Sequence, residues 1–590
     1  MSVSEVMKFP SPPRGDGIPR TRPDAGHGTL PPPSAGEGGP CVSRGRSGRS
    51  PAETGHRFRV ERALHEGCAS ISTVAPLSAG LRPDPPASQG TLPRRGGREI
   101  ALALALTALT GCVVGPDYSR PSVETPLAFK QGGAREDSVA QVAAKKNWRA
   151  AAPNDHAERG DWWRVFKDPA LDRLIRLVDV DNQSLRQSVA AYRQARAIVE
   201  QARAALYPTV VGAPSITRQR IAGTERTSVA LLGQASWELD LFGGIRRNLE
   251  SQTALAQADA AQLALTRLAI QAEVATNYFS LRYADSLQKL LNENVENFKR
   301  TLQITENQYN AGVAARSDVI TAQTQVQTTQ AAAVAVALTR ATFEHAIATL
   351  IGRPPSELTL PVALLPNRPP AVPVGIPSDL LERRPDVAQA ERLVQSQSEQ
   401  IGVAVAAFYP TVTLSASGGI SGLTRNGLLS AANQVWSVSA AGTEVLFDGG
   451  ARSAALQATR AGYDGAVANY RQTVLAAFAE VENGLAGVRI LARQQAAQDE
   501  AVTSARRAVE ITLNEYRAGT QNFTTVVTAQ NLQLTNEVAA LQIRLNRFTT
   551  AITLVRALGG GWDARSLPGD AELKGARLPI DLSPAVRVEE

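Results

Sequence analysis

The sequence predicts a mainly α-helical chain with a small β part. Only 5% of its 590 residues are aromatic, although 43% are hydrophobic, a composition that suits long helices better than a large mixed core. Heptad repeats of apolar residues extend over two long stretches. Two segments of strand-like alternation recur roughly 200 residues apart, which indicates a duplicated unit.

The net charge of +7 does not indicate a nucleic-acid-binding protein. The first 111 residues contain 14 Lys and Arg against 9 Asp and Glu, whereas the remaining residues contain 48 against 46. A surface that follows phosphates needs a concentrated basic face. Nucleic acid is therefore not an expected partner.

The N-terminal segment is expected to have two parts. Residues 1–95 are rich in Pro, Gly and Arg, so they bury too little apolar surface to offset chain entropy and predict a disordered extension. An alternative is that this stretch lies upstream of the true translation start. Arginines at 94, 95 and 98 then precede an apolar run, and this order predicts a lipoprotein signal peptide over 96–111.

Leu109-Thr110-Gly111-Cys112 resembles the bacterial lipobox, in which the cysteine is lipidated and becomes the mature N-terminus. Cys112 is the last of three cysteines, so neither a disulfide framework nor a cysteine metal site is expected after it. The alternative is a small buried cysteine after an apolar strand. We expect an acyl anchor such as palmitate at Cys112, followed by a mature N-terminal linker over 112–160. Aspartate directly after the lipidated cysteine is the familiar inner-membrane retention signal in enteric bacteria. Val113 occupies that position here, so the sequence resembles that of a lipoprotein sorted to the outer membrane.

The mature region contains two copies of one unit. Four motifs recur in order at offsets of 202 to 207 residues: ALYPTV at 205–210 and AFYPTV at 407–412, GGIR at 243–246 and GGAR at 449–452, AEV at 272–274 and 479–481, and NQYNAG at 307–312 and NEYRAG at 514–519. This period is too long for a solenoid and indicates a doubled half-molecule. The copies are placed at 161–370 and 371–562, before a C-terminal tail over 563–590.

Each copy is expected to begin with helices that end at a Tyr-Pro pair, because proline disfavours helix in the residue before it. A β-hairpin then follows, at about 209–241 in the first copy and about 411–447 in the second, where apolar and polar residues alternate. We expect the first hairpin turn at 223–227 and the second at about 423–433.

A long helix follows each hairpin, at about 247–310 and about 451–518. The main seam residues are seven apart: Val274, Leu281, Gln288, Val295, Leu302 and Tyr309, then Val467, Val474, Val481, Val488, Gln495, Val502, Val509 and Tyr516. Sustained heptads predict helix supercoiling. Shorter helices are expected to run back over about 317–350 and 524–558, after a glycine that ends each long helix.

The strands suggest a membrane role. Lengths of roughly 10–13 residues match tilted transmembrane β-strands. Four strands cannot close a barrel, and lipid excludes open edges, so three copies with twelve strands are a natural closed solution. The alternative is a soluble coiled-coil protein with small sheet caps.

Further motifs resemble TolC-like outer-membrane efflux proteins, specifically the lipoprotein outer-membrane factors of tripartite, RND-type multidrug exporters. These motifs are CVVGPDY at 112–118 with Pro121, WW at 162–163 with Phe166 and DP at 168–169, RRPDV at 383–387 with AE at 390–391, and ALGGGW at 557–562. The resemblance implies a homotrimer in which each chain supplies one third of a twelve-stranded transmembrane β-barrel and of a long coiled α-helical barrel in the periplasm.

The resemblance also implies a location and partners. The protein would be lipid-anchored in the outer membrane and would meet a periplasmic membrane-fusion adaptor and an inner-membrane transporter. It would conduct drugs or other small molecules passively, without a cofactor or metal. No phosphate-binding loop or nucleophile elbow occurs, so no enzyme activity is expected. The alternative function is a lipid-anchored periplasmic coiled-coil adaptor or structural protein, which the duplicated hairpins disfavour.

In the family, turns at the periplasmic helix ends meet the adaptor and form the gate. The matching turns are 309–318 and 516–525, so Tyr309, Asp318, Tyr516 and Arg517 are tip or gate candidates. A structural interpretation is also open: the tyrosines pack in the heptad seam, Asp318 caps a helix start and Arg517 lies near a helix end. Many relatives have aspartate near the second tip, where this chain has Gln521, Asn522 and Thr528. This difference disfavours a ring of acidic side chains that would select substrates at the gate.

Overall fold

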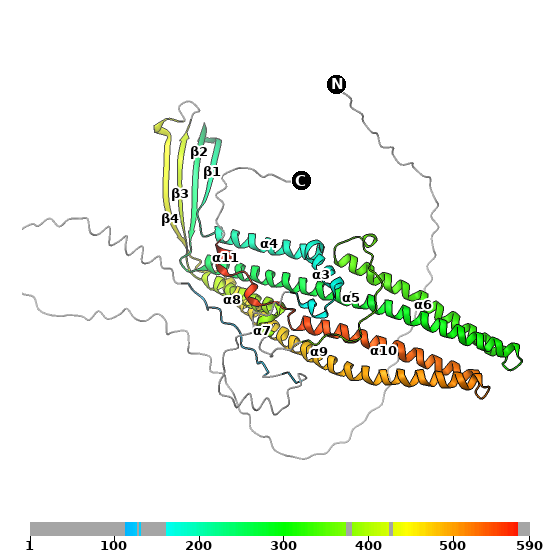
Figure 1. Cartoon of the computed structure of the whole chain (residues 1–590). Helices are drawn as coiled ribbons and strands as arrows, with labels where there is room; N and C mark the ends of the chain where they lie inside the picture. The colour runs from blue at the N-terminus through cyan, green and yellow to red at the C-terminus, as the bar shows by residue number, and fades with distance from the viewer. Residues whose placement is uncertain (1–112, 127–128, 131–160, 373–379, 424–428, 576–590) are drawn as a thin grey trace, which may run out of the picture. The chain divides into compact units, whose positions relative to one another are not determined.

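The computed structural model describes residues 113–126, 129–130, 161–372, 380–423 and 429–575 (Figure 1). The predicted extension over 1–95, the signal peptide over 96–111 and Cys112 lie outside the described residues. Within the described part, the predicted fold class is confirmed, because long helices accompany one four-stranded antiparallel sheet.

The first copy contains these elements: η1 (Trp162–Phe166), α3 (Pro169–Asp181), α4 (Gln183–Ala204), β1 (Thr209–Ile221), β2 (Thr224–Leu239), α5 (Gly244–Asn310), α6 (Arg316–Leu350) and η2 (Pro355–Glu357). The second copy and the segment after it contain α7 (Leu380–Arg383), α8 (Pro385–Ala406), β3 (Thr411–Gly422), η4 (Ala431–Asn433), β4 (Gln434–Thr443), α9 (Ala451–Arg517), α10 (Phe523–Ala557), η5 (Ala564–Ser566) and α11 (Asp570–Lys574). The duplication predicted from the motifs is therefore also a duplication of element order.

The two long helices are equal in length. Helices α5 and α9 each have 67 residues, and α6 and α10, which run back along them, each have 35 (Figure 1). Glycine stands at the N-cap of both long helices, Gly243 with φ 81° and Gly450 with φ 91°, where a side chain would strain the left-handed backbone. At about 1.5 Å per residue, each long helix spans roughly 100 Å.

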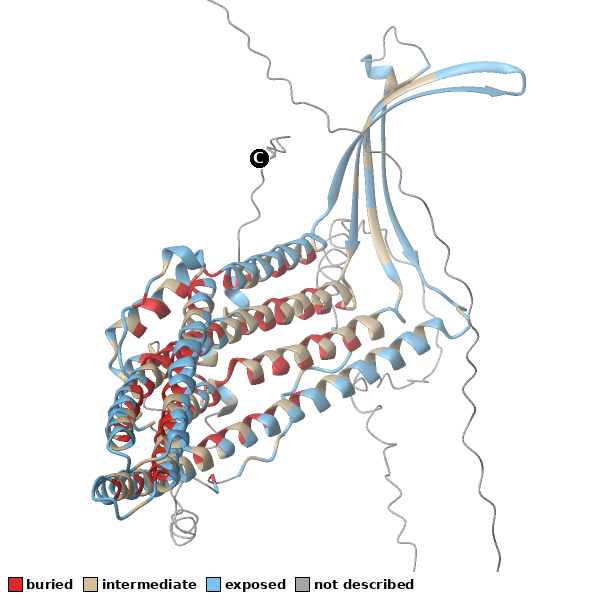
Figure 2. Ribbon diagram, turned by 90° about the vertical axis from the view of Figure 1, so that its right-hand side faces the viewer, coloured by how far each residue is buried: buried red, intermediate tan, exposed pale blue. Residues whose placement is uncertain are grey.

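The largest core lies where α3, the middle of α5 and the C-terminal parts of α6 and α10 meet. Val274 and Leu281 of the predicted seam are fully buried there, and the rings of Phe279 and Phe548 stack at 4.6 Å. In Figure 2 the buried residues follow the helix surfaces that face one another. The heptad prediction is thus confirmed for this part of α5.

The sheet has the strand order β1-β2-β3-β4, so β2 and β3 join the two copies. Pairing of β1 with β2 continues to Ile221 and Thr224. The first turn therefore consists of Ala222 and Gly223, both with positive φ, as in the two-residue turns typical of hairpins. The predicted turn at 223–227 was wrong, because the polar residues after Gly223 form strand rather than loop.

Candidate functional surfaces and family

In the four-stranded region, one face of the sheet is apolar except for Gln434, which pairs with Ile420 at the start of β4. Directly paired residues of antiparallel strands point to the same side, so the register identifies this apolar face. It consists of Val210, Gly212, Pro214 and Ile216 of β1, Val229, Leu231, Gly233, Ala235, Trp237 and Leu239 of β2, Val412, Leu414, Ala416, Gly418 and Ile420 of β3, and Trp436, Val438, Ala440 and Gly442 of β4. Many of its large side chains are exposed, which a protein surrounded by water avoids on this scale.

The opposite face of the sheet is mostly polar. Its centre carries Gln234, Ser236, Ser415, Ser417, Ser437 and Ser439. The hydroxyl oxygens of Ser417 and Ser437 lie 2.8 Å apart across β3 and β4. Alternation of an outer apolar and an inner polar face is the pattern of a transmembrane barrel strand.

The first hairpin continues beyond this two-faced region. Pairing of β2 with β3 begins only at Val229, so residues 217–221 and 224–228 extend past β3. This extension is exposed and charged, and Arg218 pairs with Glu225 at 2.6 Å (Figure 2). It therefore marks the level at which the apolar face ends.

A second feature is the N-terminal strap, which we define as residues 113–126. Its amide at Val114 donates to the carbonyl of Phe242 at 3.1 Å. Gly115 has φ 94°, and a Cβ there would lie only 2.7 Å from the Cα of Gly402 on α8. Val113 in turn lies against Gly243. The first described residue is therefore fixed where β2 passes into α5.

A buried arginine fastens the N-terminal strap. The side chains of Arg247 on α5 and Glu399 on α8 are only 7% and 6% exposed, and they pair at 2.8 Å. Arg247 also pairs with Asp117 of the strap at 2.8 Å. Burial alone would lower the pKa of Arg247, but the bonds to Glu399 and Asp117 outweigh it and raise that pKa.

The strap makes a second polar contact further along α8. The hydroxyl of Tyr118 donates to Glu391 at 2.5 Å, and burial, followed by this carboxylate, raises the pKa of Tyr118. Tyr118 and Glu391 belong to the motifs that carried the family resemblance, whereas Arg247 and Glu399 were not predicted. The sequence shows one charged residue on each of two predicted helices, but it does not show that these two residues meet.

The tip tyrosines differ in environment. Tyr516 is 5% exposed and packs with Phe523, Ala322 and Val526, whereas Tyr309 is 40% exposed. The expectation that both pack in the heptad seam is confirmed for Tyr516 and was wrong for Tyr309. The residue at the position of Phe523 in the first copy is Arg316, which offers no aromatic cover.

The two charged tip candidates lie at helix ends. Arg517 is the last residue of α9 and donates to the Asn514 side chain at 3.2 Å. Asp318 lies in the first turn of α6, but the N-cap is Ala315, so the expectation that Asp318 caps the helix was wrong. Helix α6, which carries Asp318, reaches Tyr516 of the other copy, because Ala322 packs in the same cluster as that tyrosine. Burial raises the pKa of Tyr516, interaction with the Thr305 side chain lowers it, and the charge of Asp318 raises it.

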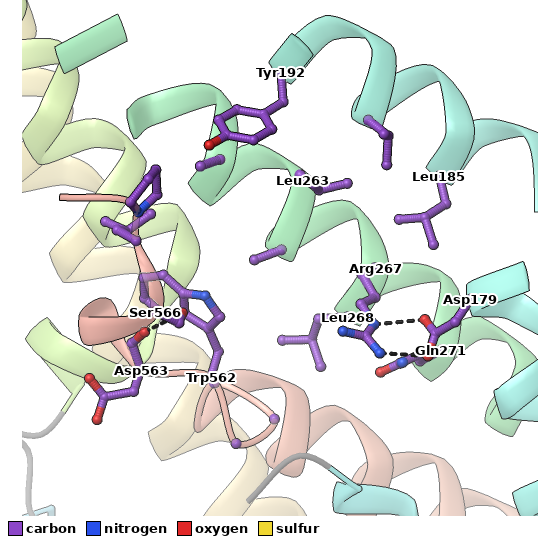
Figure 3. Close-up of a pocket in the computed structure, with 18 of the residues that line it drawn as sticks. Asp179, Leu185, Tyr192, Leu263, Arg267, Leu268, Gln271, Trp562, Asp563 and Ser566 are labelled. Carbon is purple, nitrogen blue, oxygen red and sulfur yellow. Dashed lines mark hydrogen bonds and ion pairs between the residues drawn. The ribbon is translucent and has the colours of Figure 1, made fainter. Parts of the chain in front are cut away.

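A cavity of about 760 Å³ lies between α4, α5 and the segment after α10 (Figure 3). Tyr192, Leu263 and Trp562 form part of its wall, and Asp179 holds Arg267 through two hydrogen bonds. Its described lining contains neither histidine nor cysteine, so no nucleophile with an imidazole base is found there.

Two searches of the described residues were negative. They contain no group of three or more His, Cys, Asp or Glu side chains placed to hold a metal ion. No helix in the described part of the chain is both long and apolar enough to cross a membrane.

Comparison with known proteins gives consistent matches. The family model for outer membrane efflux proteins matches residues 174–353 and 376–560. The probable efflux pump outer membrane protein TtgC of Pseudomonas putida is 32% identical over 476 residues, which cover 78% of this chain and 95% of the relative. Outer membrane protein OprJ of Pseudomonas aeruginosa is 31% identical over 483 residues, covering 79% and 96%.

Solved structures agree with these relatives. The outer-membrane channel OprN superimposes with a TM-score of 0.69 and 32% identity, covering 76% of this chain and 100% of that one. The MtrE outer membrane channel of Neisseria gonorrhoeae gives a TM-score of 0.67 and 26% identity, covering 77% and 99%. The family match includes both copies of the duplicated unit. The chain therefore belongs to the outer membrane efflux protein family, whose members are transport proteins and not enzymes.

Proposed function

We propose that this chain is one subunit of the outer-membrane exit duct of a tripartite efflux system. Drugs or other small molecules would pass through the duct without chemistry at this subunit. The sheet carries the proposal: its apolar face suits lipid and its polar face suits a water-filled lumen. Relatives named as efflux pump outer membrane proteins and channels support it.

The proposed assembly is a homotrimer. Among the described strands, β1 and β4 each pair on one side only. Lipid cannot satisfy the free hydrogen-bonding groups of such edges, so other copies must supply the missing strands. Three copies give twelve strands in a closed barrel, and their α5, α6, α9 and α10 helices would form the periplasmic tube.

The helix tips are proposed as the contact with a periplasmic membrane-fusion adaptor, below which an inner-membrane transporter would supply the energy. Tyr309, Asp318 and Arg517 are candidates for docking or gate contacts. Tyr516 is a candidate of another kind, since its burial against Phe523 supports a role in holding the α9–α10 turn. The alternative, a lipid-anchored periplasmic adaptor, does not explain a duplicated hairpin with an exposed apolar face.

We propose that Cys112 carries a lipid anchor in the outer membrane, after removal of the signal peptide over 96–111. The N-terminal strap supports this, because Val113 is fixed at the junction of β2 with α5. In the proposed assembly that junction is the periplasmic rim of the barrel. An acyl chain on the preceding residue could reach the adjacent leaflet from there.

The duct proposal is tested on the purified full chain. We expect outer-membrane fractions to contain a trimer band that disappears on heating, and planar lipid bilayers to show discrete conductance steps. A deletion strain should become more sensitive to exported compounds, and the wild-type gene should restore resistance. A monomer that washes free in aqueous buffer and gives no conductance would contradict the proposal.

The anchor is tested by replacing Cys112 with serine. Metabolic labelling with palmitate should be lost in Cys112→Ser and retained in the matched variant Cys68→Ser. The heat-sensitive trimer should persist in both variants, since the strands are unchanged. Unaltered labelling of Cys112→Ser would refute the anchor while leaving the duct proposal intact.

A further inference from the structure

We infer that the free edge of β4 pairs with the free edge of β1 in a second copy in one defined register. In this register Ala440 lies directly opposite Ile216 of the partner subunit. The inference rests on the proposed trimer and adds which residues meet at its strand interface. The partner chemistry is that of a second copy of this chain.

The register follows from the equivalence of the two hairpins. Strands β1 and β3 both begin directly after Tyr-Pro, so Thr209 corresponds to Thr411. Thr209 pairs with Ser236, and Thr411 pairs with Thr443. Ser236 therefore corresponds to Thr443. Positions in β1 and β3 differ by 202 residues, and positions in β2 and β4 differ by 207.

The junction of β2 with β3 is the template for the missing junction. It joins the first copy of the unit to the second, and it pairs Gly233 with Gly418. In a closed ring of such units, the next junction joins β4 to β1 of the partner subunit. Applying the two offsets to the first pair gives Ala440 opposite Ile216 of the partner subunit. Leu239 with Val412 likewise becomes Leu446 opposite Val210 of the partner subunit.

The side chains on the two free edges match in this register, although they were not used to derive it. Leu446, which follows β4 by three residues, is 91% exposed and Val210 is 73% exposed; continued past Thr443, the register brings them together on the apolar face. On the opposite face, exposed Val445, which also follows the end of β4, meets Val211 of the partner subunit. The polar pairs Ser437 with Gln219 and Ser439 with Thr217 of the partner subunit also fall on that face.

Near the charged extension, Val438 and Trp436 come opposite Arg218 and Arg220 of the partner subunit. An indole face attracts a guanidinium, and the stem of an arginine covers apolar surface. Both contacts lie where the apolar face ends and the charged extension begins, so pairing an apolar side chain with an arginine is favourable there.

Other registers lose these matches. A shift of one residue would place apolar and polar faces on the same side. A shift of two residues in one direction places Leu446 opposite Gly212, and in the other direction opposite Pro208, before the strand begins. The second shift brings exposed Val438 opposite Ile216 of the partner subunit, but it leaves Leu446 and Val445 without apolar partners.

Cysteine cross-linking tests the register in the full chain. The background is Cys41→Ser with Cys68→Ser, which leaves only Cys112 besides the introduced pair. The test variant adds Ala440→Cys and Ile216→Cys. Directly opposite Cβ atoms lie about 4.5–5.5 Å apart and diagonal ones about 7–8 Å, whereas a disulfide needs about 3.5–4.5 Å. Direct pairs should therefore oxidise most readily.

Matched variants control for geometry. Ala440→Cys with Pro214→Cys and Ala440→Cys with Arg218→Cys test the two neighbouring registers. Gly233→Cys with Gly418→Cys is the equivalent pair within one chain, so it should form a disulfide without joining subunits. We expect only the Ala440/Ile216 variant to shift strongly to dimer and trimer bands on heated, non-reducing gels, and reductant should reverse the shift.

The outcomes separate this inference from the proposed function. Stronger cross-linking of the Pro214 or Arg218 variant would overturn the register. No intersubunit cross-link in any variant, with a wild-type trimer and conductance present, would overturn the pairing of β4 with β1 and leave the duct intact. A wild-type protein with neither trimer nor conductance would refute both.

Discussion

At the residue scale, the ion pair between Arg247 and Glu399 explains how three segments are held together. It joins α5 to α8, and the same guanidinium holds Asp117 of the N-terminal strap. A buried pair adds little stability over apolar packing, but removing one partner leaves an uncompensated charge. The pair therefore makes the arrangement of these segments specific.

Glu399→Gln is expected to destabilise the protein strongly. Loss of the carboxylate leaves Arg247 buried with only Asp117 as a charged partner, and breaking such a pair costs about 3–5 kcal/mol. Denaturant unfolding in detergent, followed by circular dichroism, measures the change. The control is Asp179→Asn, where the partner Arg267 is 54% exposed and the expected cost is about 0–1 kcal/mol. Equal effects of the two variants would contradict this assignment.

Asp448 predicts a specific response to acid. It accepts hydrogen bonds from the Arg452 side chain and from the amides of Gly450 and Arg452, which lower its pKa from 3.8 to about 2. A depressed pKa means that its stabilising contribution is present above about pH 4 and is lost as the pH falls towards 2. Wild type should therefore exceed Asp448→Asn in unfolding midpoint at pH 6. The difference should vanish near pH 2, and a difference that persists there would argue against the mechanism.

At the element scale, the sequence predicts helices better than connections. Helix α5 was expected over about 247–310 and is found over Gly244–Asn310, because heptad periodicity and a terminal glycine are both visible in the residues. The first hairpin turn was misplaced, since polar residues in an exposed strand resemble a loop. The N-terminal strap was expected only as a linker, because its contacts lie on helices far away in sequence.

The tip candidates show the same limit. Tyr309 and Tyr516 have equivalent places in the heptad, yet only Tyr516 is covered. The cover comes from Phe523 and from Ala322 of the other copy, neither of which the heptad contains. Sequence symmetry therefore predicts equivalent heptad positions for the two tyrosines, but it does not predict that their environments differ.

Tyr516→Ala should loosen the α9–α10 turn, whereas Tyr309→Ala should not loosen the α5–α6 turn. Removing a buried aromatic side chain costs about 3–5 kcal/mol, and an exposed one costs much less. Hydrogen exchange of peptides from each turn measures the local opening. Similar protection in both variants would show that Tyr516 does not hold its turn.

Gly115→Ala should release the N-terminal strap. The substitution strains a backbone at φ 94° and places a methyl group 2.7 Å from the Cα of Gly402. Limited proteolysis should cut the strap faster in this variant than in wild type. Gly465→Ala is the control, because a Cβ there meets no atom within 4 Å and alanine favours the α9 helix. Unchanged cleavage of Gly115→Ala would contradict the described packing.

At the scale of the whole molecule, one chain leaves surfaces that its own residues do not cover. Leu475, Val488 and Ile490 are exposed on α9, although Val488 occupies a heptad position. The equivalent residue of α5, Leu281, is fully buried. The sequence reveals the duplication, but it does not show that the two copies differ in burial, because burial depends on which neighbours are present.

The N-terminal region allows a prediction for the whole chain. If residues 1–95 are an extension ahead of the signal peptide, deletion of residues 2–92 should leave the mature protein unchanged. Intact mass spectrometry of the outer-membrane product should give the same species, beginning at acylated Cys112, for both genes. A wild-type product that retains residues before Cys112 would contradict this organisation.

The unpaired edges of β1 and β4 have a consequence for biogenesis. A newly exported chain that travels alone offers two ready templates for strand addition by any extended peptide it meets. Its passage across the periplasm therefore calls for a chaperone that shields these strands until the other subunits bind. When such chaperones are depleted, the chain should accumulate as aggregate rather than as soluble monomer.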